Sequence, residues 1–194
     1  MNILIINASP IINGNISNML RIYNEKLNKD IHVEELRIID LNYRPCIGCM
    51  KCRDLSRCIL PEDDAHLFGK KIQWADLIVI GAPVYWGNMP GNLKVLFDRN
   101  VFIFMKESKK GIPVKQLKGK MGIIFTSCTT PFPFDRIFKQ STGLLNSINE
   151  IFKYSGITTI GRIIYAGTKD KAGIPVSIQT KIKALSSKCN KLKV

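Results

Sequence analysis

The chain has 194 residues, of which 45% are hydrophobic and 23% charged, and this length and composition are typical of one folded domain. We therefore expect a single domain over residues 1–194, and the composition excludes a disordered chain, a collagen-like repeat and a disulfide-stapled miniprotein. Lysine and arginine exceed the acidic residues by 14, which raises nucleic acid, acidic lipid or a phosphorylated ligand as partners without choosing among them.

Hydrophobic periodicity predicts strands that alternate with helices along the whole chain. The strands are expected at 3–6, 33–39, 76–81, 119–126 and 157–165, and the helices at 16–27, 61–75, 92–104, 134–154 and 176–188. Such alternation with short connections predicts an α/β fold, a doubly wound parallel sheet of five strands with helices on both faces.

No apolar run is long enough to cross a bilayer, and the N-terminus has no basic residue before Arg21, unlike a secretory signal. We therefore expect a cytoplasmic protein without a membrane partner. In that compartment the six cysteines are expected to be thiols, thiolates or metal ligands rather than disulfides.

Ligands of doubly wound sheets bind beyond the carboxyl ends of the strands, which nominates the loops 8–17, 82–91 and 127–134. The first loop offers hydroxyls, a side-chain amide and main-chain amides at a helix N-terminus, an arrangement typical of phosphate binding. It has no lysine or arginine, so it is neither a P-loop nor the glycine-rich dinucleotide motif, and its polar residues could also form only a turn and a helix cap.

The second loop carries the adjacent aromatics Tyr85 and Trp86 among residues that continue neither a strand nor a helix. A planar heteroaromatic ligand could stack there, and the alternative is that the aromatic pair packs the loop onto the domain. The third loop is polar at first and then apolar, which is also typical of an ordinary helix cap.

Several motifs together resemble one family, the flavodoxin-like NAD(P)H-dependent FMN reductases, close to the iron-sulfur flavoproteins. The motifs are Asn7-Ala-Ser-Pro10 with Gly14-Asn15, the run from Gly81 to Lys94, Phe97-Asp-Arg99 and a cysteine cluster. The resemblance implies FMN as cofactor, NAD(P)H as co-substrate, and no catalytic side chain, because the cofactor carries the chemistry. It also implies a homodimer or tetramer.

By this resemblance, three groups of residues bind FMN. The phosphate would be held by Ser9, Asn15, Ile16 and Ser17. The ring and the ribityl chain would be lined by Pro83, Val84, Tyr85, Trp86, Gly87 and Asn88. The other side of the ring would be bordered by Ser127 and Cys128. The chain departs from the family where Ile11 and Ile16 replace a common Arg and Thr, and where Ser127 and Cys128 replace glycines.

Four cysteines, Cys46, Cys49, Cys52 and Cys58, crowd into a loop at 44–60. Four thiolates could hold a [4Fe-4S] cluster, as in the iron-sulfur flavoproteins, or zinc, although zinc sites usually use two separated cysteine pairs. They could also remain free thiols or a redox-active pair. Arginines and lysines around them are expected to lower the thiol pKa values, while Cys128 and Cys189 are expected to be buried.

Four hypotheses of function follow. The leading hypothesis is an FMN-dependent oxidoreductase that takes a hydride from NAD(P)H and passes electrons to a small-molecule or protein acceptor. The alternatives are an iron-sulfur electron carrier with an acidic, ferredoxin-type partner, a flavodoxin-like scaffold without cofactor, and a basic nucleic-acid-binding module. The last is disfavoured because the lysines are scattered rather than set in a known motif.

Overall fold

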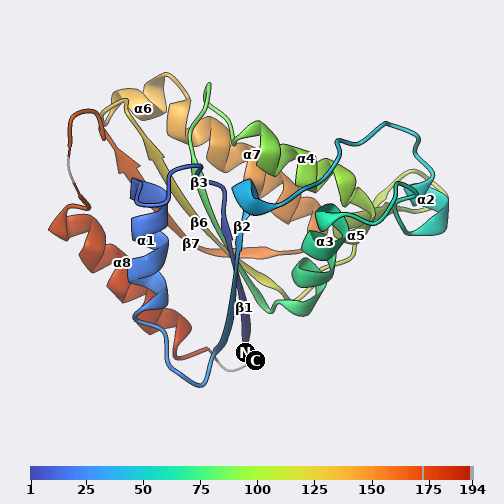
Figure 1. Ribbon diagram of the computed structural model, residues 1–194, viewed down its shortest axis with the longest axis horizontal. Coiled ribbons are helices and arrows are strands. Elements are labelled where there is room, and N and C mark those ends of the chain that lie inside the picture. The colour runs from blue at the N-terminus through green and yellow to red at the C-terminus, as the bar shows by residue number, and fades with distance from the viewer. Residues whose placement is uncertain (172, 193–194) are drawn as a thin grey trace.

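Five parallel strands form the centre of the molecule, in the order β2-β1-β3-β6-β7 (Figure 1). A computed structural model describes residues 1–171 and 173–192. The strands are β1 (Asn2–Asn7), β2 (His32–Arg37), β3 (Leu77–Pro83), β6 (Met121–Cys128) and β7 (Thr158–Ala166). The predicted doubly wound five-stranded sheet is confirmed.

Helices cover both faces of the sheet because the central strands are apolar on both sides. Helices α1 (Asn15–Asn24) and α8 (Val176–Cys189) pack on one face, against residues such as Ile3 and Ile5 of β1. Helices α3 (Asp64–Trp74), α4 (Gly91–Arg99) and α7 (Gln140–Ser155) pack on the other, against Leu4 and Ile6. Successive residues of β1 therefore enter opposite cores, as the two-residue period of a strand requires.

The carboxyl ends of β1, β3 and β6 meet at one edge of the sheet. Asn7 lies beside Gly81, and Pro83 lies beside Ser127, in the parallel register of these strands. The chain leaves β1 toward β2 on one side and returns to β3 on the other, so the strand order reverses here. This edge is where a doubly wound fold presents its ligand site.

Two helices predicted as continuous are divided. The helix expected at 92–104 splits at Asn100 into α4 and α5 (Val101–Phe104), and the Asn100 amide donates to the carbonyls of Ala65 and Leu96. The helix expected at 134–154 splits into α6 (Phe134–Ile137) and α7, since Lys139 has a φ of 55° that no helix continues through.

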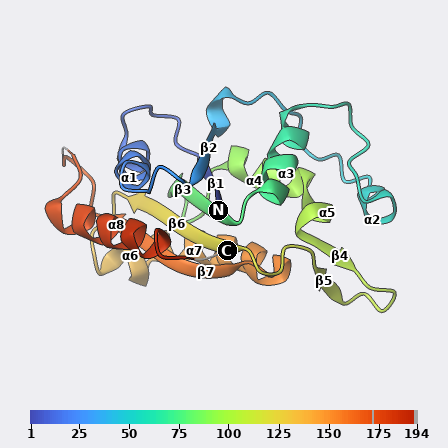
Figure 2. The ribbon, with the colours of Figure 1, turned by 90° about the horizontal axis from the view of Figure 1, so that it is seen from below.

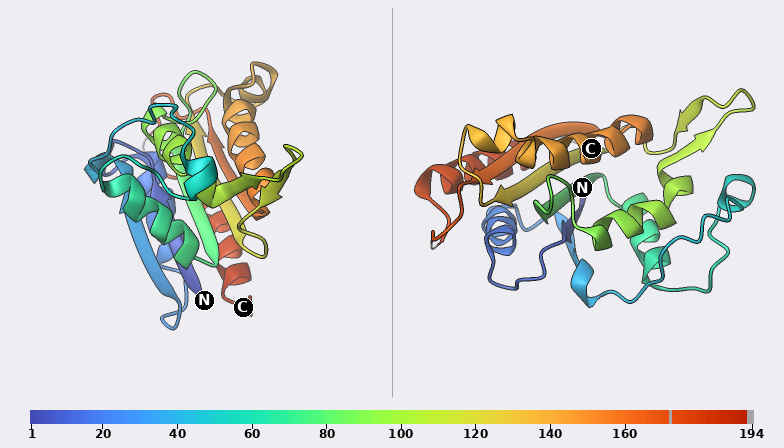
Figure 3. Two further views of the ribbon diagram at one scale, coloured as in Figure 1. Left: turned by 90° about the vertical axis from the view of Figure 1, so that its right-hand side faces the viewer. Right: turned by 90° about the horizontal axis from the view of Figure 1, so that it is seen from above.

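Four short elements were not predicted: the 3-10 turn η1 (Ile38–Asp40), α2 (Cys52–Leu55), and the antiparallel strands β4 (Met105–Glu107) and β5 (Pro113–Lys115). Three- and four-residue elements are too short for hydrophobic periodicity to reveal. The β4–β5 hairpin projects from the body of the molecule at the end that also carries α2 (Figures 2 and 3). Within the described residues, the helices all fall short of the length and apolarity that a membrane crossing needs.

Candidate functional site

The loop after β1 is organised around Asn7, whose side chain is buried at the end of that strand. Its Oδ1 accepts a hydrogen bond from the Ser9 N–H at 3.1 Å, and its Nδ2 donates to the Ser17 Oγ at 3.1 Å. The hydroxyls of Ser9 and Ser17 both donate to the carbonyl oxygen of Ile11, at 3.3 and 2.9 Å. The loop is therefore preformed, and a ligand that used these hydroxyls would replace the Ile11 carbonyl.

Helix α1 begins directly after this loop, and no side chain among the described residues caps it. Gly14 occupies the N-cap position, and the first turn contains no acidic residue. The N–H groups of Asn15, Ile16 and Ser17 have no carbonyl to bond within the helix, and they carry the positive end of its dipole. Because the Ile16 side chain lies in the core, that residue can offer a ligand only its N–H. An anionic group suits such a helix end.

A polar hollow of about 270 Å³ flanks the same loop between α1 and β2. Arg21 and Arg37 line it together with Asn13, Ser17 and Glu35. The Nε of Arg37 is buried and has no partner in the part of the chain that the structure describes. The fold thus brings two cations beside a loop whose own residues are uncharged, which the loop sequence alone did not reveal.

The loop after β3 turns sharply at Tyr85–Asn88. The N–H of Tyr85 donates to the Asn88 carbonyl and the N–H of Asn88 donates to the Tyr85 carbonyl, both at 2.9 Å. Trp86 and Gly87, the two central residues, have φ values of 52° and 71°, as a type I′ turn requires. The Trp86 side chain is fully exposed and that of Tyr85 is half exposed, so the alternative in which both pack the loop onto the domain is wrong for Trp86.

This turn rests on the beginning of α7. A Cβ added to Gly143 would lie 2.0 Å from the Gly87 carbonyl oxygen, and one added to Gly87 would lie 3.2 Å from the Lys139 carbonyl oxygen. The two main chains approach so closely that only glycine fits at 143. Gly143, which the sequence analysis did not single out, therefore sets the position of the turn.

The loop after β6 joins the turn region from the other side. The N–H of Val84 donates to the Ser127 carbonyl at 3.0 Å, and Ser127 and Cys128 are both buried. Asp135 lies close by, only 1% exposed, and accepts a hydrogen bond from the Ser141 hydroxyl at 2.5 Å through Oδ2. Its Oδ1 is buried without a partner among the described residues. Burial, and then the charge of Asp135, raise the pKa of the Cys128 thiol, as expected for a buried cysteine.

Exposed apolar side chains surround the three loops. The first loop contributes Ile11 and Ile12, the second Tyr85 and Trp86, and the third Phe132 and Phe134. Helix α6 and its C-cap, which follow the third loop, add Ile137 and Phe138. Phe134 and Phe138 stack with their ring centroids 6.0 Å apart. Apolar groups next to unpaired main-chain amides suit a ligand with a flat, apolar body and an anionic end.

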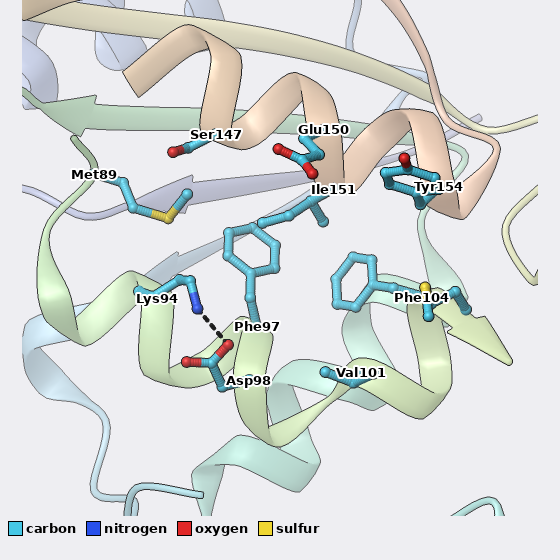
Figure 4. A pocket seen from close by; sticks show the side chains of 11 residues that line it. Met89, Lys94, Phe97, Asp98, Val101, Phe104, Ser147, Glu150, Ile151 and Tyr154 are labelled. Atoms are coloured by element: carbon cyan, nitrogen blue, oxygen red, sulfur yellow. Dashed lines mark hydrogen bonds and ion pairs between the residues drawn. The ribbon is translucent and has the colours of Figure 1, made fainter. Parts of the chain in front are cut away.

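An apolar groove of about 360 Å³ runs between α4 and α7 (Figure 4). Phe97 and Phe104 form its floor and Val101 and Tyr154 stand at its edge, while Met89, from the end of the second loop, closes one side. The groove is separate from the three loops, although Met89 connects it to the second of them.

The beginning of the cysteine loop, together with Tyr43 just before it, is held to α4 at two points. The Tyr43 hydroxyl donates to the Asn92 carbonyl at 3.0 Å, and the buried Arg99 donates to the Arg44 carbonyl at 2.6 Å. Arg99 also binds both carboxylate oxygens of Asp63, at 2.7 and 3.0 Å. Asp63 in turn caps α3 by accepting from the Ala65 N–H at 3.1 Å. One buried guanidinium therefore ties the loop to two helices.

The ion pair between Asp63 and Arg99 shifts the pKa values of both residues. Burial acts to raise the pKa of Asp63, but hydrogen bonds from Arg99 and the main chain outweigh it and lower the pKa to about 2. Burial likewise acts to lower the pKa of Arg99, and hydrogen bonds with Asp63 and Cys58 raise it. Cys58 thus lies beside Arg99, a neighbour that spacing in the sequence could not supply.

The four loop thiols do not form a ligand set as they lie. In the described residues, no group of three cysteine, histidine or acidic side chains is placed to hold a metal ion. Cys46 and Cys49 are exposed, while Cys52 and Cys58 are half-buried. Burial, and then the charges of Cys46 and Cys49, raise the pKa of Cys52, so the expectation of a lowered pKa is wrong for that thiol. Because the charges of Cys46 and Cys49 affect the pKa of Cys52, these three thiols lie within electrostatic reach of one another.

The sequence-predicted residues thus fall into two regions. The twelve predicted FMN-binding residues belong to the three loops that the sheet brings together. The four thiols lie elsewhere, in the loop between η1 and α3 near the C-terminal end of α4: Cys46, Cys49, Cys52 and Cys58. Sequence reasoning gave no role to Arg99 and did not single out Asp135 or Gly143. Arg99 stands in a quoted motif, but its partner is 36 residues away in sequence.

Comparison with known proteins supports the same architecture. A family model described as "Flavodoxin-like fold" matches residues 1–188. An iron-sulfur flavoprotein of Methanocaldococcus jannaschii is 35% identical over 104 residues, which are 52% of this chain and 52% of that protein. An iron-sulfur flavoprotein of Methanosarcina thermophila is 44% identical over 62 residues, 32% of each chain. The chain therefore spans about half or less of the length of these curated relatives.

Solved structures match over nearly the whole chain. A protein from Streptococcus mutans superposes with a TM-score of 0.76 at 22% identity, covering 98% of this chain and 99% of the other. An FMN-dependent NADH-azoreductase of Bacillus anthracis, solved with FMN, gives a TM-score of 0.74 at 18% identity with the same coverage. These matches confirm the resemblance drawn from the sequence motifs. By the extent of the family match, the chain belongs to the flavodoxin-like fold family.

Proposed function

We propose that this protein is an FMN-dependent oxidoreductase that takes a hydride from NADH or NADPH and passes the electrons to an acceptor. The observation that carries the proposal is the meeting of three preformed loops at the reversal of strand order, next to an uncapped helix N-terminus. The azoreductase with a similar fold was solved with FMN, and the partial relatives are named as flavoproteins, which supports the choice of ligand.

Each loop supplies one kind of contact. The first would hold the phosphate through Ser9, Ser17 and the N–H groups of Asn15 and Ile16, since that helix end favours an anion. The second would offer the main chain and side chains of Pro83 to Asn88 to the ring and the ribityl chain. Ser127 and Cys128 would border the opposite side of the ring.

Bound FMN would supply the redox chemistry, accepting the hydride and releasing the electrons. The protein's part is to hold and orient the ring, so no side-chain acid or base is assigned to the hydride step. The exposed aromatic and aliphatic groups around the loops would exclude water from one side of the nicotinamide.

Fluorescence titration of the apoprotein with FMN tests this proposal directly. We expect one FMN per chain, with Ser17→Ala weakening binding several-fold and the exposed Ser187→Ala leaving it unchanged. Under anaerobic conditions NADH or NADPH should bleach the bound flavin in a stopped-flow instrument. Absence of FMN binding, or of bleaching by either nicotinamide, would refute the assignment.

A second candidate function is that of an iron-sulfur electron carrier, with a [4Fe-4S] cluster on Cys46, Cys49, Cys52 and Cys58. The mutual influence of these thiols and the names of the partial relatives favour it, although the loop would have to rearrange to bring the sulfurs together. Anaerobic purification followed by iron and sulfide analysis should give about four irons per chain. Cys49→Ser should then lose iron while the buried Cys128→Ser keeps it; an iron-free wild type removes the candidate.

The groove between α4 and α7 is the surface that best fits a homodimer or a larger assembly, because it is apolar and open. Sedimentation of the purified protein measures the assembly directly. The six free cysteines fit a reducing compartment such as the cytoplasm.

A further inference from the structure

The polar hollow between α1 and β2 has no part in the proposed FMN contacts, apart from Ser17, which belongs both to it and to the first loop. In the strand order β2-β1-β3-β6-β7, the loops that would line the flavin ring follow β3 and β6, whereas β2 forms one wall of the hollow (Figure 1). The hollow therefore borders the first loop on the side away from the ring. A group that entered it would be attached to the phosphate end of the flavin.

Arg37 supplies the hollow with a cation whose hydrogen bonds are unsatisfied. Its Nε is buried without a partner among the described residues, and its Nη1 pairs with Asp40 Oδ2 only at 3.8 Å, beyond hydrogen-bond distance. Arg21, on α1, donates to Glu25 and Asn18 at 3.3 Å. The side chains of Glu25 and Asp40 are more than half exposed, so water screens their charges. Both guanidinium groups can therefore bind an anion, and their planar donors fit phosphate oxygens.

Glu35 supplies the same hollow with a hydrogen-bond acceptor. Its Oε1 accepts from the Asn7 Nδ2 at 3.3 Å, and the same Nδ2 donates to the Ser17 Oγ at 3.1 Å. A carboxylate has two oxygens and about four acceptor sites, so Glu35 can accept further hydrogen bonds. In doubly wound folds that bind dinucleotides, an acidic side chain about 20 residues after the phosphate-binding turn accepts from the ribose hydroxyls. Glu35 has this spacing from Asn15, the first residue of α1.

The size of the hollow indicates that it holds part of a ligand. Pockets that bury a whole small molecule measure roughly 300 to 1,000 Å³. The hollow, at about 270 Å³, is smaller, and it continues into the first loop through Asn13 and Ser17. Ile12, which is 65% exposed, adds an apolar group to its otherwise polar wall. The hollow thus offers cations, a carboxylate and one apolar side chain to whatever extends beyond a phosphate in the first loop.

We infer that the polar hollow binds the adenosine half of FAD, so that this flavin site accepts the dinucleotide as well as FMN. Arg37 and Arg21 bind the second phosphate, Glu35 accepts from the ribose hydroxyls, and Ile12 packs against the adenine. The inference rests on the proposed function, because the first phosphate of FAD must occupy the first loop as the FMN phosphate would. Ser17 joins the two phosphate positions, since it lines both the loop and the hollow.

Isothermal titration calorimetry of the apoprotein with FMN and with FAD tests the inference. We expect FAD to bind the wild type at least as tightly as FMN. Arg37→Met keeps an apolar stem and removes the cation, so it should raise the dissociation constant for FAD about tenfold and that for FMN less than about threefold. Retained FMN binding also shows that the variant is folded. Arg162→Met, exposed on the opposite edge strand β7, is the matched control and should change neither constant.

Three results would overturn the inference. They are binding of FAD at least about tenfold weaker than that of FMN, equal weakening of both flavins by Arg37→Met, and a raised Michaelis constant for NADPH in that variant with unchanged FAD affinity. The last result would assign the hollow to the nicotinamide cofactor.

The two flavins also separate this inference from the proposed function. A protein that binds FMN but not FAD keeps the proposed function and refutes only the role of the hollow. Binding of FAD alone would support the hollow and refute FMN as the cofactor. A protein that binds neither flavin refutes the proposed function and, with it, the inference.

Discussion

Replacing Gly143 by alanine should displace the turn at Tyr85–Asn88 while leaving the fold intact. The new methyl would lie 2.0 Å from the Gly87 carbonyl oxygen, where ordinary contact begins at 3.4 Å, so helix and turn must separate by about 1.4 Å. Overpacking of this kind costs about 1–3 kcal/mol. Alanine returns about 1 kcal/mol through its better helix propensity, so the net loss of stability is at most about 2 kcal/mol. The melting temperature should therefore fall by no more than about 8 °C.

The same displacement should also weaken FMN binding. A shift of that size would break one or two of the main-chain hydrogen bonds that the turn would make to FMN in the proposed site, each contributing about 1 kcal/mol. The dissociation constant for FMN should accordingly rise roughly 5- to 30-fold, as measured by fluorescence titration.

Gly91→Ala provides the matched control, because Gly91 begins α4 next to the same loop and an added Cβ meets nothing within 4 Å. That variant should bind FMN like the wild type. The reasoning is refuted if Gly143→Ala also keeps wild-type affinity, or if both alanines weaken binding equally.

Three further predictions concern the Asp63–Arg99 ion pair, the thiols and the groove. The pKa of Asp63, near 2, lies below its ordinary value, so the carboxylate stabilises the fold above about pH 4 and this contribution is lost as the pH falls toward 2. The variant Asp63→Asn should therefore lower the free energy of unfolding by about 1–2 kcal/mol at pH 7 and by little near pH 2. Urea titration at the two pH values measures this difference. Iodoacetamide should modify the exposed Cys46 and Cys49 of the native protein before the buried Cys128, which mass spectrometry can follow; equal rates would contradict the burial. Val101→Glu, which places a charge at the edge of the groove, should shift any oligomer toward monomer in sedimentation, and an unchanged assembly would mean that the interface lies elsewhere.

The sequence was sufficient for the sheet because each central strand is a short run of consecutive apolar residues. The strand expected at 76–81 corresponds to β3, Leu77–Pro83, and the difference at its end is one of boundary rather than of type. The breaks at Asn100 and Lys139 were not predictable in this way. Both depend on tertiary contacts or on a single backbone angle, and the hydrophobic pattern continues through them.

The candidate site was predictable at the level of loops but not of contacts. The order of the strands follows from general rules of parallel sheets, so the sequence alone is enough to bring the loops after β1, β3 and β6 together. The approach of Gly143 to Gly87 and the pairing of Arg99 with Asp63 join residues distant in sequence. Such pairs carry no local pattern, and only the packing of α7 and α4 brings them together.

The outermost strand, β2, lies at the end of the sheet order and pairs with β1. An open strand of this kind is a template on which another chain could add its own strand and begin a fibre. Charged side chains, Glu34, Glu35 and Arg37, lie along it, of which Glu34 pairs with Lys71 and Arg37 with Asp40, and a newcomer would have to pack against these charges. The charges on β2 therefore disfavour edge-to-edge pairing with another copy of the chain, both at high protein concentration and while the chain is only partly folded.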